Sequence, residues 1–489
     1  MSAPAGSTVK PAADSAAEAV IGLEVHVQLR TRAKLFCACR AELGVPPNTQ
    51  VCPVCMGLPG ALPVLNGEAV EMACRTALGL GARVNRTSAF DRRHAFDPAL
   101  PKGYRITQRA SPLATGGSLE VPGADGGARR IALARMHLGE DAGQAQQGRV
   151  PGATAVDLNR AGFPLLEIVT EPTLASAPEA RAFVVRLRQA LEYLEVSGCS
   201  MAEGSMRLDC SVSLRDGGRP GGGTTIRGLD SLDGLAAAVE GEVARQRGVL
   251  AAGGRVEHRA LEWDGNLGQA RATAEAERPA DWWMPEPDLP PLVLDDAWLR
   301  SLELGQPQLP GARSQRFVDD YGLPPEHAAA VTGGRDFADY FEAVARSGAD
   351  PREAAAWVMG DVRAALDASG GRVVEFPVRP QDLAQLLAMV SGGILSRELA
   401  RRVFARMLAT GKPAAQIVAD EGLIPVRDAG AVDAWVDQVL ADHPDEAARV
   451  RAGEDRLMGF LVAQVMERSG SRAEPTQVAE RVRAKLGAA

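Results

Sequence analysis

Four cysteines near the N-terminus are spaced like metal ligands. Cys37 and Cys39 form one close pair, Cys52 and Cys55 form a second, and twelve residues separate the pairs. Four thiolates suit a closed, tetrahedral structural zinc site better than a catalytic one, which keeps a ligand position open. The alternatives are reduced free thiols, or a redox pair at the second motif, which the lack of a βαβ pattern around it disfavours. We expect these four cysteines to bind a structural zinc ion.

A row of polar residues immediately precedes the cysteines. Glu24, His26 and Gln28 are two residues apart, so a strand over residues 21–29 would carry them on one face. The other face would carry the apolar residues Leu23, Val25, Val27 and Leu29. A carboxylate, an imidazole and an amide in one row suit a metal or phosphate site, although a solvated strand face has the same pattern.

A later stretch carries a carboxylate that could join this row, since Glu140 follows an alternating segment. Glu167 lies inside the apolar run 165–169, where a buried strand is expected. Hard cations such as Mg²⁺ prefer carboxylate oxygens. We therefore expect Glu24 and Glu140, from separate strands, to bind Mg²⁺, with His26 as a further ligand or a contact to bound water.

The motif EGSMRLD places an arginine among carboxylates. Glu203, Arg207 and Asp209 are spaced so that a strand would carry all three on one face. Such a set can bind phosphate and a metal ion, and a buried ion pair would give the same pattern. We expect Glu140, Glu203 and Arg207 to be catalytic.

Basic residues gather in the segment Ser88–Gln108, among aromatic side chains and loop-forming glycine and proline. Cations of this kind contact phosphate groups, and a solvated loop has a similar composition. We expect Arg92 and Lys102 from this segment, together with Arg160 from a later turn, to contact ATP.

The elements that must position these residues belong to a globular chain. Its 489 residues, 46% hydrophobic and 24% charged, are enough for two or three cores. The sequence contains no run of about twenty apolar residues, so we expect no membrane span. Residues 1–19 read as a disordered tail, and the seven cysteines without an even framework indicate a reducing, cytoplasmic setting. The net charge of −8 gives no general attraction to nucleic acid.

Helical periodicity predicts the main covering elements. Gly67–Leu80 and Ser176–Leu194 both have apolar residues at helical spacing. The second begins with a capping box, because Ser176 is followed three residues later by Glu179. From Asp295 the chain changes to short helical segments broken by proline and glycine.

Long stretches of the sequence resemble one family. IGLEVHVQL, KLFCAC, VCPVCMGLPGALPVLN, FDRRHAFDPALPKGYRITQ, DLNRAGFPLLEIVTEP and PEPDLPPL are similar to the B subunit of the aspartyl/glutamyl-tRNA(Asn/Gln) amidotransferase, the GatB family. The similarity continues through WVMGDV and GILSRELARRVF to LMGFLVAQVM near the end of the chain. The chain is identified as a divergent member.

The resemblance implies an α+β fold with three domains. A cradle domain resembling the glutamine synthetase fold would span residues 20–293, with the zinc knuckle inserted at 37–55. An all-α domain would follow over 294–408, and a small helical tail domain of the YqeY type over 409–489.

The resemblance also implies an ATP-dependent carbon–nitrogen ligase with glutamine as the amido-nitrogen donor. ATP and Mg²⁺ would phosphorylate the carboxylate of misacylated Glu-tRNA(Gln) or Asp-tRNA(Asn), and ammonia would displace the phosphate. The amidase, or A, subunit would supply the ammonia, within a cytoplasmic heterotrimer that includes the small C subunit. The chain has no Ser-Ser-Lys amidase signature, in agreement with glutamine hydrolysis by another subunit. It also has no Walker loop.

The chain departs from the family pattern at several polar positions. Gly139 and Ala202 each stand where the family has the first of two glutamates, so restoring an acid at Gly139 is expected to strengthen Mg²⁺ binding or leave activity unchanged. Gly221–Leu232 is a shortened strand, and Trp282 and Trp283 replace an Arg-containing motif. These losses favour an alternative function, a divergent paralogue that acts as a binding or scaffold subunit.

Overall fold

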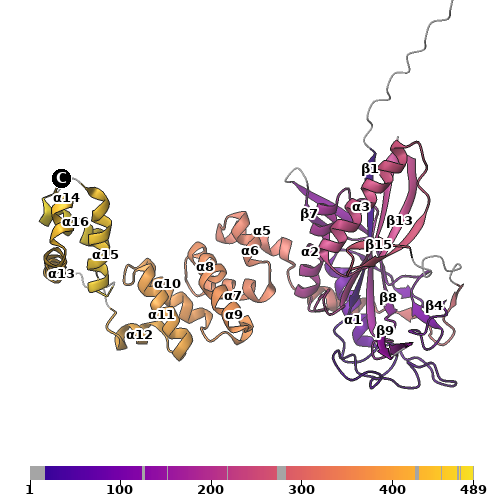
Figure 1. The fold of residues 1–489 in the computed structure, drawn as a ribbon. Coiled ribbons are helices and arrows are strands. Elements are labelled where there is room, and N and C mark those ends of the chain that lie inside the picture. The colour runs from indigo at the N-terminus through magenta and orange to yellow at the C-terminus, as the bar shows by residue number, and fades with distance from the viewer. Residues whose placement is uncertain are drawn as a thin grey trace, which may run out of the picture. The chain divides into compact units, whose positions relative to one another are not determined.

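The computed structural model describes residues 17–123, 127–150, 152–216, 219–272, 282–423, 429–452, 454–470, 473 and 475–487. The chain divides between Leu309 and Pro310 into two compact units. A tail was expected over residues 1–19. Residues 1–16 lie outside the described residues, and Glu18 and Ala19 belong to the first strand. The α+β expectation is confirmed, since a sheet unit precedes a helical one (Figure 1).

The first unit is built on a large mixed sheet that contains thirteen of the described strands. Its path is β15 (Gln269–Arg271), β14 (Arg259–Asp264), β13 (Arg219–Leu229), β12 (Met206–Asp216), β1 (Glu18–Gln28), β11 (Pro164–Thr170), β8 (Ala128–Glu140), β5 (Tyr104–Thr107), β4 (Asp91–His94) and β16 (Trp282–Pro285). Three short strands lie off this path: β6 (Ala114–Thr115) and β7 (Ser118–Pro122) pair with β8, and β2 (Arg83–Val84) pairs with β6. Two small pairs complete the strands, β9 (Gln144–Val150) with β10 (Ala153–Asp157) and β3 (Thr87–Ser88) with β17 (Leu292–Val293).

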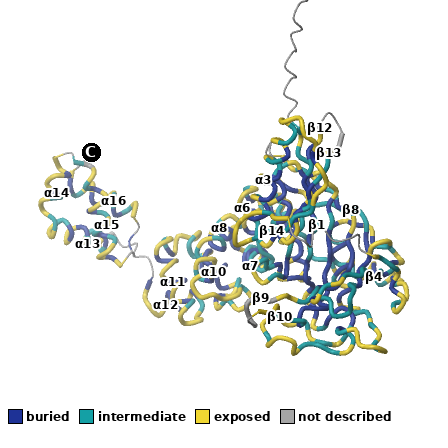
Figure 2. The backbone as a smooth tube through the Cα atoms, turned by 45° about the vertical axis from the view of Figure 1, so that its right-hand side comes forward, coloured by how far each residue is buried: buried dark blue, intermediate teal, exposed yellow. Residues whose placement is uncertain are grey.

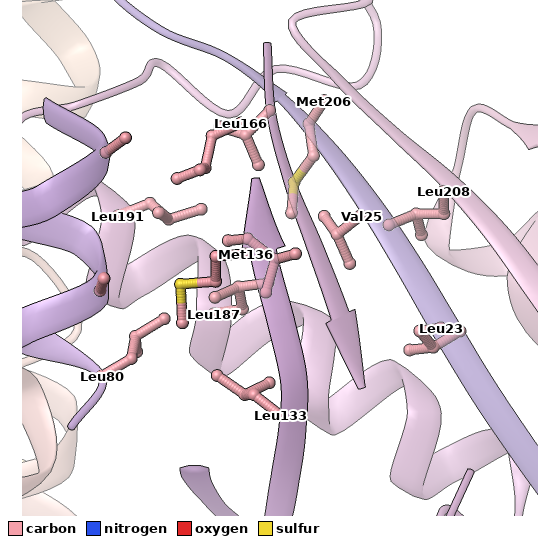
Figure 3. Close-up of a cluster of buried hydrophobic side chains, with 14 of the residues drawn as sticks. Leu23, Val25, Leu80, Leu133, Met136, Leu166, Leu187, Leu191, Met206 and Leu208 are labelled. Carbon is pink, nitrogen blue, oxygen red and sulfur yellow. The ribbon is translucent and has the colours of Figure 1, made fainter. Parts of the chain in front are cut away.

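The central strand β1 has the predicted alternation. Its apolar side chains lie on the covered face of the sheet, where they meet those of β8, β11 and β12. Figure 3 shows this core, which includes Leu23, Val25, Met136, Leu166, Met206 and Leu208. Buried backbone follows β1 and β8 through the middle of the unit (Figure 2). The polar side chains of the same strands therefore share the opposite face.

Three capped helices cover the apolar face, α1 (Gly67–Gly79), α2 (Ala177–Tyr193) and α3 (Leu232–Ala251). Ser176 caps α2 as predicted: its Oγ accepts from the backbone N–H of Glu179 at 3.3 Å. The Glu179 carboxylate in turn accepts a hydrogen bond from the backbone N–H of Ala175 at 2.6 Å. This exchange satisfies donors that a helix start leaves unpaired, so the cap fixes where α2 begins.

The second unit is helical throughout its described residues. Its helices are α5 (Pro310–Tyr321), α6 (Pro325–Val331), α7 (Arg335–Arg346), α8 (Pro351–Trp357), a π-helical turn (Val358–Val362), α9 (Arg363–Ser369), a 3-10 turn (Val373–Glu375), α10 (Pro380–Ser391), α11 (Arg397–Thr410), α12 (Ala414–Asp420), α13 (Ala429–Asp442), α14 (Pro444–Arg451), a 3-10 turn (Asp455–Leu457), α15 (Met458–Arg468) and α16 (Pro475–Leu486). None of the described helices is both long and apolar enough to cross a membrane.

Hydrophobic packing places the domain limits differently from the sequence expectation. Helix α4 (Asp296–Leu304) contributes Leu299 to the core of the sheet unit, so that unit continues past residue 293. One helical core runs from Phe317 to Leu423 and includes α12, beyond the expected limit at 408. A separate core runs from Val432 to Leu486.

Candidate functional site

The exposed face of the sheet carries a row of ionisable side chains across four adjacent strands. His26 on β1 lies opposite Glu167 on β11 and opposite Arg207 on β12. Glu167 in turn lies opposite His137 on β8. Residues directly opposite each other in antiparallel strands project to the same face, so these four side chains form one line.

Acidic and imidazole groups alternate along this line. His137 Nε2 lies 2.6 Å from Glu167 Oε2, His26 Nδ1 lies 3.6 Å from Glu167 Oε1, and His26 Nε2 lies 3.6 Å from Asp209 Oδ2. Burial lowers the pKa of His26, but hydrogen bonding and charge from Asp209 and Glu167 outweigh it and raise the pKa to about 10. Burial raises the pKa of Glu167, yet the two histidines bring it well below its ordinary value. His26 and Glu167 therefore each stabilise the charged form of the other.

A cavity of about 330 Å³ opens in front of this row. Its lining residues are Glu24, His26, Arg93, Arg105, Asp141, Ala142, Leu165, Glu167, Arg207, Asp209, Arg227 and Gly228. A second hollow of about 170 Å³ shares Glu24, Arg93, Arg105 and Glu167 with it, and adds Arg109, Arg135, His137 and Trp283 among other residues. Arginines beside carboxylates can bind a phosphate group and a divalent cation together.

Three side chains of this face could hold one metal ion. Glu24, His26 and Glu167 each offer a ligand atom, and these atoms all lie within 4.8 Å of one another. Two carboxylates and one imidazole form a donor set that a hard divalent cation accepts once His26 has released its proton, with water in the remaining positions. Glu24 and His26 therefore come together as expected, but their partner is Glu167.

The expectation that Glu140 completes this set is corrected by the register of β8. His137 and Glu140 are three residues apart on one continuous strand, so they project to opposite faces. Glu140 instead pairs with Lys102, and its Oε1 accepts from the N–H of Ile106 at 2.8 Å. These residues line a hollow of about 170 Å³ beside Cys37 on the other face.

Asp141, the residue after β8, returns the chain to the exposed face. Its carboxylate pairs with Arg207 and accepts from Arg160 Nη2 at 2.9 Å. Burial raises the pKa of Asp141, but both guanidinium groups act against it, and the net pKa is below the ordinary value. Arg207 is the more exposed of the two and lines the cavity, and its expected catalytic role stays a prediction.

Arg160 has a positioning role in the structure. Besides Asp141, it donates to the carbonyl oxygen of Gly204 at 2.7 Å and to that of Glu203 at 3.3 Å. Glu203 is exposed and lies in the turn before β12, so the expectation that it shares a strand face with Arg207 is corrected. The reason is that the strand begins only at Met206, three residues after Glu203.

The other two cations expected to contact ATP lie on the knuckle side of the sheet. Arg92 donates to Glu286 at 2.7 and 2.8 Å and to Asp288 at 2.7 Å, and its guanidinium lies 4.3 Å from the Tyr104 ring centre. The bond to Glu286 raises the pKa of Arg92. Because Lys102 is paired with Glu140, the charges of both cations are already balanced within the protein.

The four cysteines converge as their spacing predicts. Sulfur atoms of Cys37, Cys39, Cys52 and Cys55 lie within 4.8 Å of one another, a donor set that could bind a metal such as zinc. A hydrogen bond from Cys37 is the largest of several influences that lower the pKa of Cys55 to about 5. The backbone N–H of Cys52 also reaches Cys55 Sγ at 3.1 Å, and Lys34 Nζ lies 3.9 Å from it. A thiolate is thus favoured at Cys55, which suits metal binding.

The functional placement of Glu167, His137 and Arg105 was not predicted from the sequence. Glu167 carried a visible signal, since it is the one charged residue inside the apolar strand β11. A buried carboxylate needs partners, and these lie on neighbouring strands. His137 and Arg105 gave no comparable local signal, because their partner is 30 and 62 residues away in the sequence, respectively.

Comparisons with known proteins cover both units. The GatB/GatE catalytic domain family matches residues 19–300, and the GatB domain family matches residues 339–486. The B subunit of the aspartyl/glutamyl-tRNA(Asn/Gln) amidotransferase of Moorella thermoacetica is 43% identical over 474 residues, which is 96% of this chain and 99% of the relative. The protein of the same name from Geotalea daltonii is 42% identical, with the same coverage. That of Halorhodospira halophila is 41% identical over 473 residues, again 96% and 99% of the two chains.

Proposed function

The chain belongs to the GatB/GatE family, and we propose that it is the B subunit of a glutamine-dependent tRNA amidotransferase, which activates and amidates the side-chain carboxylate of a misacylated tRNA. The substrate is Glu-tRNA(Gln), Asp-tRNA(Asn) or both. The partners are an amidase (the A subunit), which releases ammonia from glutamine, and a small third protein (the C subunit). A tRNA substrate and reduced cysteines support a cytoplasmic location.

The reaction begins with activation of a poor acyl donor. A carboxylate oxygen of the aminoacyl side chain attacks the γ-phosphorus of ATP, ADP leaves, and an acyl phosphate forms. The nitrogen of ammonia then attacks the acyl carbon, the carbon–oxygen bond to phosphate breaks, and the nitrogen loses a proton. The products are the amide, ADP and inorganic phosphate, so the chain is an ATP-dependent carbon–nitrogen ligase.

The observation that carries this proposal is the metal-competent set Glu24, His26 and Glu167 beside an arginine-lined cavity of about 330 Å³. Bound Mg²⁺ would neutralise charge on the transferring phosphoryl group. Arg207, held by Asp141, lies where it can contact a phosphate oxygen in the same cavity. A broad sheet with one charged face also suits the cradle of a glutamine synthetase-type domain. Zinc at the four cysteines would fix the knuckle.

The proposal is tested with the chain assembled with its partner subunits. ATP hydrolysis is measured with and without misacylated tRNA, in wild type and in Glu167→Gln. We expect turnover that requires the tRNA and that falls by about a hundredfold or more in the variant, since one electrostatic catalytic contact is typically worth that much. Glu18→Gln, an exposed glutamate on the same strand as Glu24, is the matched control and should keep full turnover.

Glutamine hydrolysis by the partner amidase should survive in every variant, because that chemistry belongs to another chain. Wild-type protein that binds its partners but hydrolyses no ATP with misacylated tRNA would contradict the proposal. It would favour the scaffold alternative, which draws no support from the relatives, since the three named above are all amidotransferase B subunits.

A further inference from the structure

The environment of Gly139 shows why this position carries no side chain. Gly139 lies on β8 between Thr107 on β5 and Leu165 on β11, and it faces the cavity side of the sheet. A Cβ atom built here would lie 3.0 Å from Glu167 Oε1 and 3.0 Å from Thr107 Oγ1. These distances are closer than ordinary carbon–oxygen contacts, so a side chain at this position requires the Glu167 carboxylate or the Thr107 hydroxyl to shift by a few tenths of an ångström. The effect of an acid restored at Gly139 alone on Mg²⁺ binding stays a prediction.

A guanidinium group contacts the same carboxylate oxygen that restricts Gly139. Arg105 Nη2 donates to Glu167 Oε1 at 2.9 Å, and Arg105 Nε donates to the backbone carbonyl of Glu140 at 2.9 Å. Two bonds from one planar group fix its orientation. A guanidinium group is not deprotonated in proteins, so Arg105 is permanently cationic.

Glu167 contacts Arg105 and is also one of the three possible ligands of the metal ion. Phosphoryl-transfer sites with two divalent cations hold them about 3.5–4 Å apart and need carboxylates for both. Glu24, His26 and Glu167 supply ligands for one ion. Gly139, on β8 opposite Leu165, offers no ligand beside Glu167 Oε1, and the charge that contacts this oxygen is the guanidinium of Arg105.

We propose that Arg105 takes the place of a second divalent cation, so that this site binds a single divalent cation and uses the guanidinium as its other positive charge. The proposal rests on the proposed function, since it concerns the charge that meets ATP phosphates. Arg105 lines the cavity together with His26 and Arg207, so a phosphate bound in the cavity would meet its positive charge. Gly139 and Arg105 are then a matched pair, because Arg105 holds the Glu167 oxygen that lies 3.0 Å from the position of a Gly139 Cβ atom.

The test counts Mn²⁺ ions, which replace Mg²⁺ and are visible by electron paramagnetic resonance. The full chain, loaded with zinc and assembled with its partner subunits, is titrated with Mn²⁺ alone. We expect one ion at this site, without the exchange coupling that two ions about 3.5–4 Å apart would show. Arg105→Gln removes a positive charge next to the ion, and should tighten Mn²⁺ binding by about tenfold or more. Arg130→Gln, an exposed arginine of β8, is the control and should leave binding unchanged.

The paired variant Arg105→Gln with Gly139→Glu should bind two exchange-coupled Mn²⁺ ions. Two coupled ions in the wild type would overturn the proposal, as would unchanged Mn²⁺ affinity in Arg105→Gln or a single ion in a folded paired variant. If the paired variant does not fold, Arg105→Gln alone decides. The ion count requires neither ATP nor tRNA, so its outcome is separate from a failure of tRNA-dependent ATP turnover.

Discussion

Glu167 is the residue on which the proposed site depends most. Its carboxylate is buried, yet it meets His137 on β8, His26 on β1 and Arg105 on β5. These contacts compensate the cost of burying the charge, and they hold the oxygen atoms in one orientation. The same orientation is what a metal ion requires of a preorganised ligand.

The cysteine cluster gives a prediction about metal removal. Replacing Cys52 by Ser deletes one of four converging sulfur ligands, so zinc should be lost and the knuckle should loosen. We expect zinc analysis to fall from about one ion per chain to near zero, with a lower midpoint of thermal unfolding. Cys74→Ala, at a buried cysteine in α1 outside the cluster, should keep its zinc. Full zinc in Cys52→Ser would contradict the assignment.

The residues could be predicted from sequence only where their partners are close in the chain. The cysteines were found because a knuckle is local, and Glu24 with His26 because strand alternation is local. Glu140 was assigned to the wrong face, since the phase of β8 relative to β1 depends on cross-strand register. Arg105 could not be assigned to Glu167 for the same reason, because hydrogen bonding across strands leaves no mark in the spacing.

The positions of helices and strands could be predicted from hydrophobic periodicity and capping residues. Residues 176–194 were predicted as a capped helix, and α2 begins at Ala177 after the Ser176 cap. From Asp295 the sequence predicts short helical segments broken by proline and glycine, and α5, α6 and α7 have this form. Pro324 and Gly334 account for the breaks, since each stands at the N-cap position of a new helix.

A carboxylate joins two of these helices, and it makes their stability depend on pH. Glu342 on α7 accepts from Arg313 and Arg316 on α5, with distances of 2.9 to 3.0 Å. Burial raises the pKa of Glu342, but the arginines lower it to about 2. The folded-state pKa is depressed, so this contribution is complete above about pH 4.5 and is lost as the pH falls towards 2.

We predict that Glu342→Gln lowers the free energy of unfolding of the helical core by roughly 2–3 kcal/mol at pH 7, and by progressively less as the pH falls from about 4.5. Denaturant unfolding of the full chain, followed by circular dichroism at pH 7 and near pH 3, measures the difference. Glu326→Gln, at an exposed glutamate of α6, should have little effect at either pH. An equal loss in Glu342→Gln at both pH values would show that the ion pairs are not responsible.

At the scale of the whole molecule, the order of a sheet unit followed by helices could be predicted, and the limits of the cores could not. Leu299 belongs to the first core and Leu423 to the second, although both lie beyond the expected limits. Periodicity marks which face of a helix is apolar, but it does not say which core that face joins. That choice depends on contacts between distant segments.

The central claim is that this chain activates the side-chain carboxylate of an aminoacyl-tRNA by phosphorylation. It is tested most directly with tRNA whose misacylated glutamate or aspartate carries ¹⁸O in the side-chain carboxylate. The assembled protein is given this tRNA, ATP and glutamine, and the released inorganic phosphate is analysed by mass spectrometry. An acyl phosphate requires a carboxylate oxygen to leave with the phosphate, so we expect one ¹⁸O atom in the phosphate formed with each amide. Amide formation with unlabelled phosphate would contradict it.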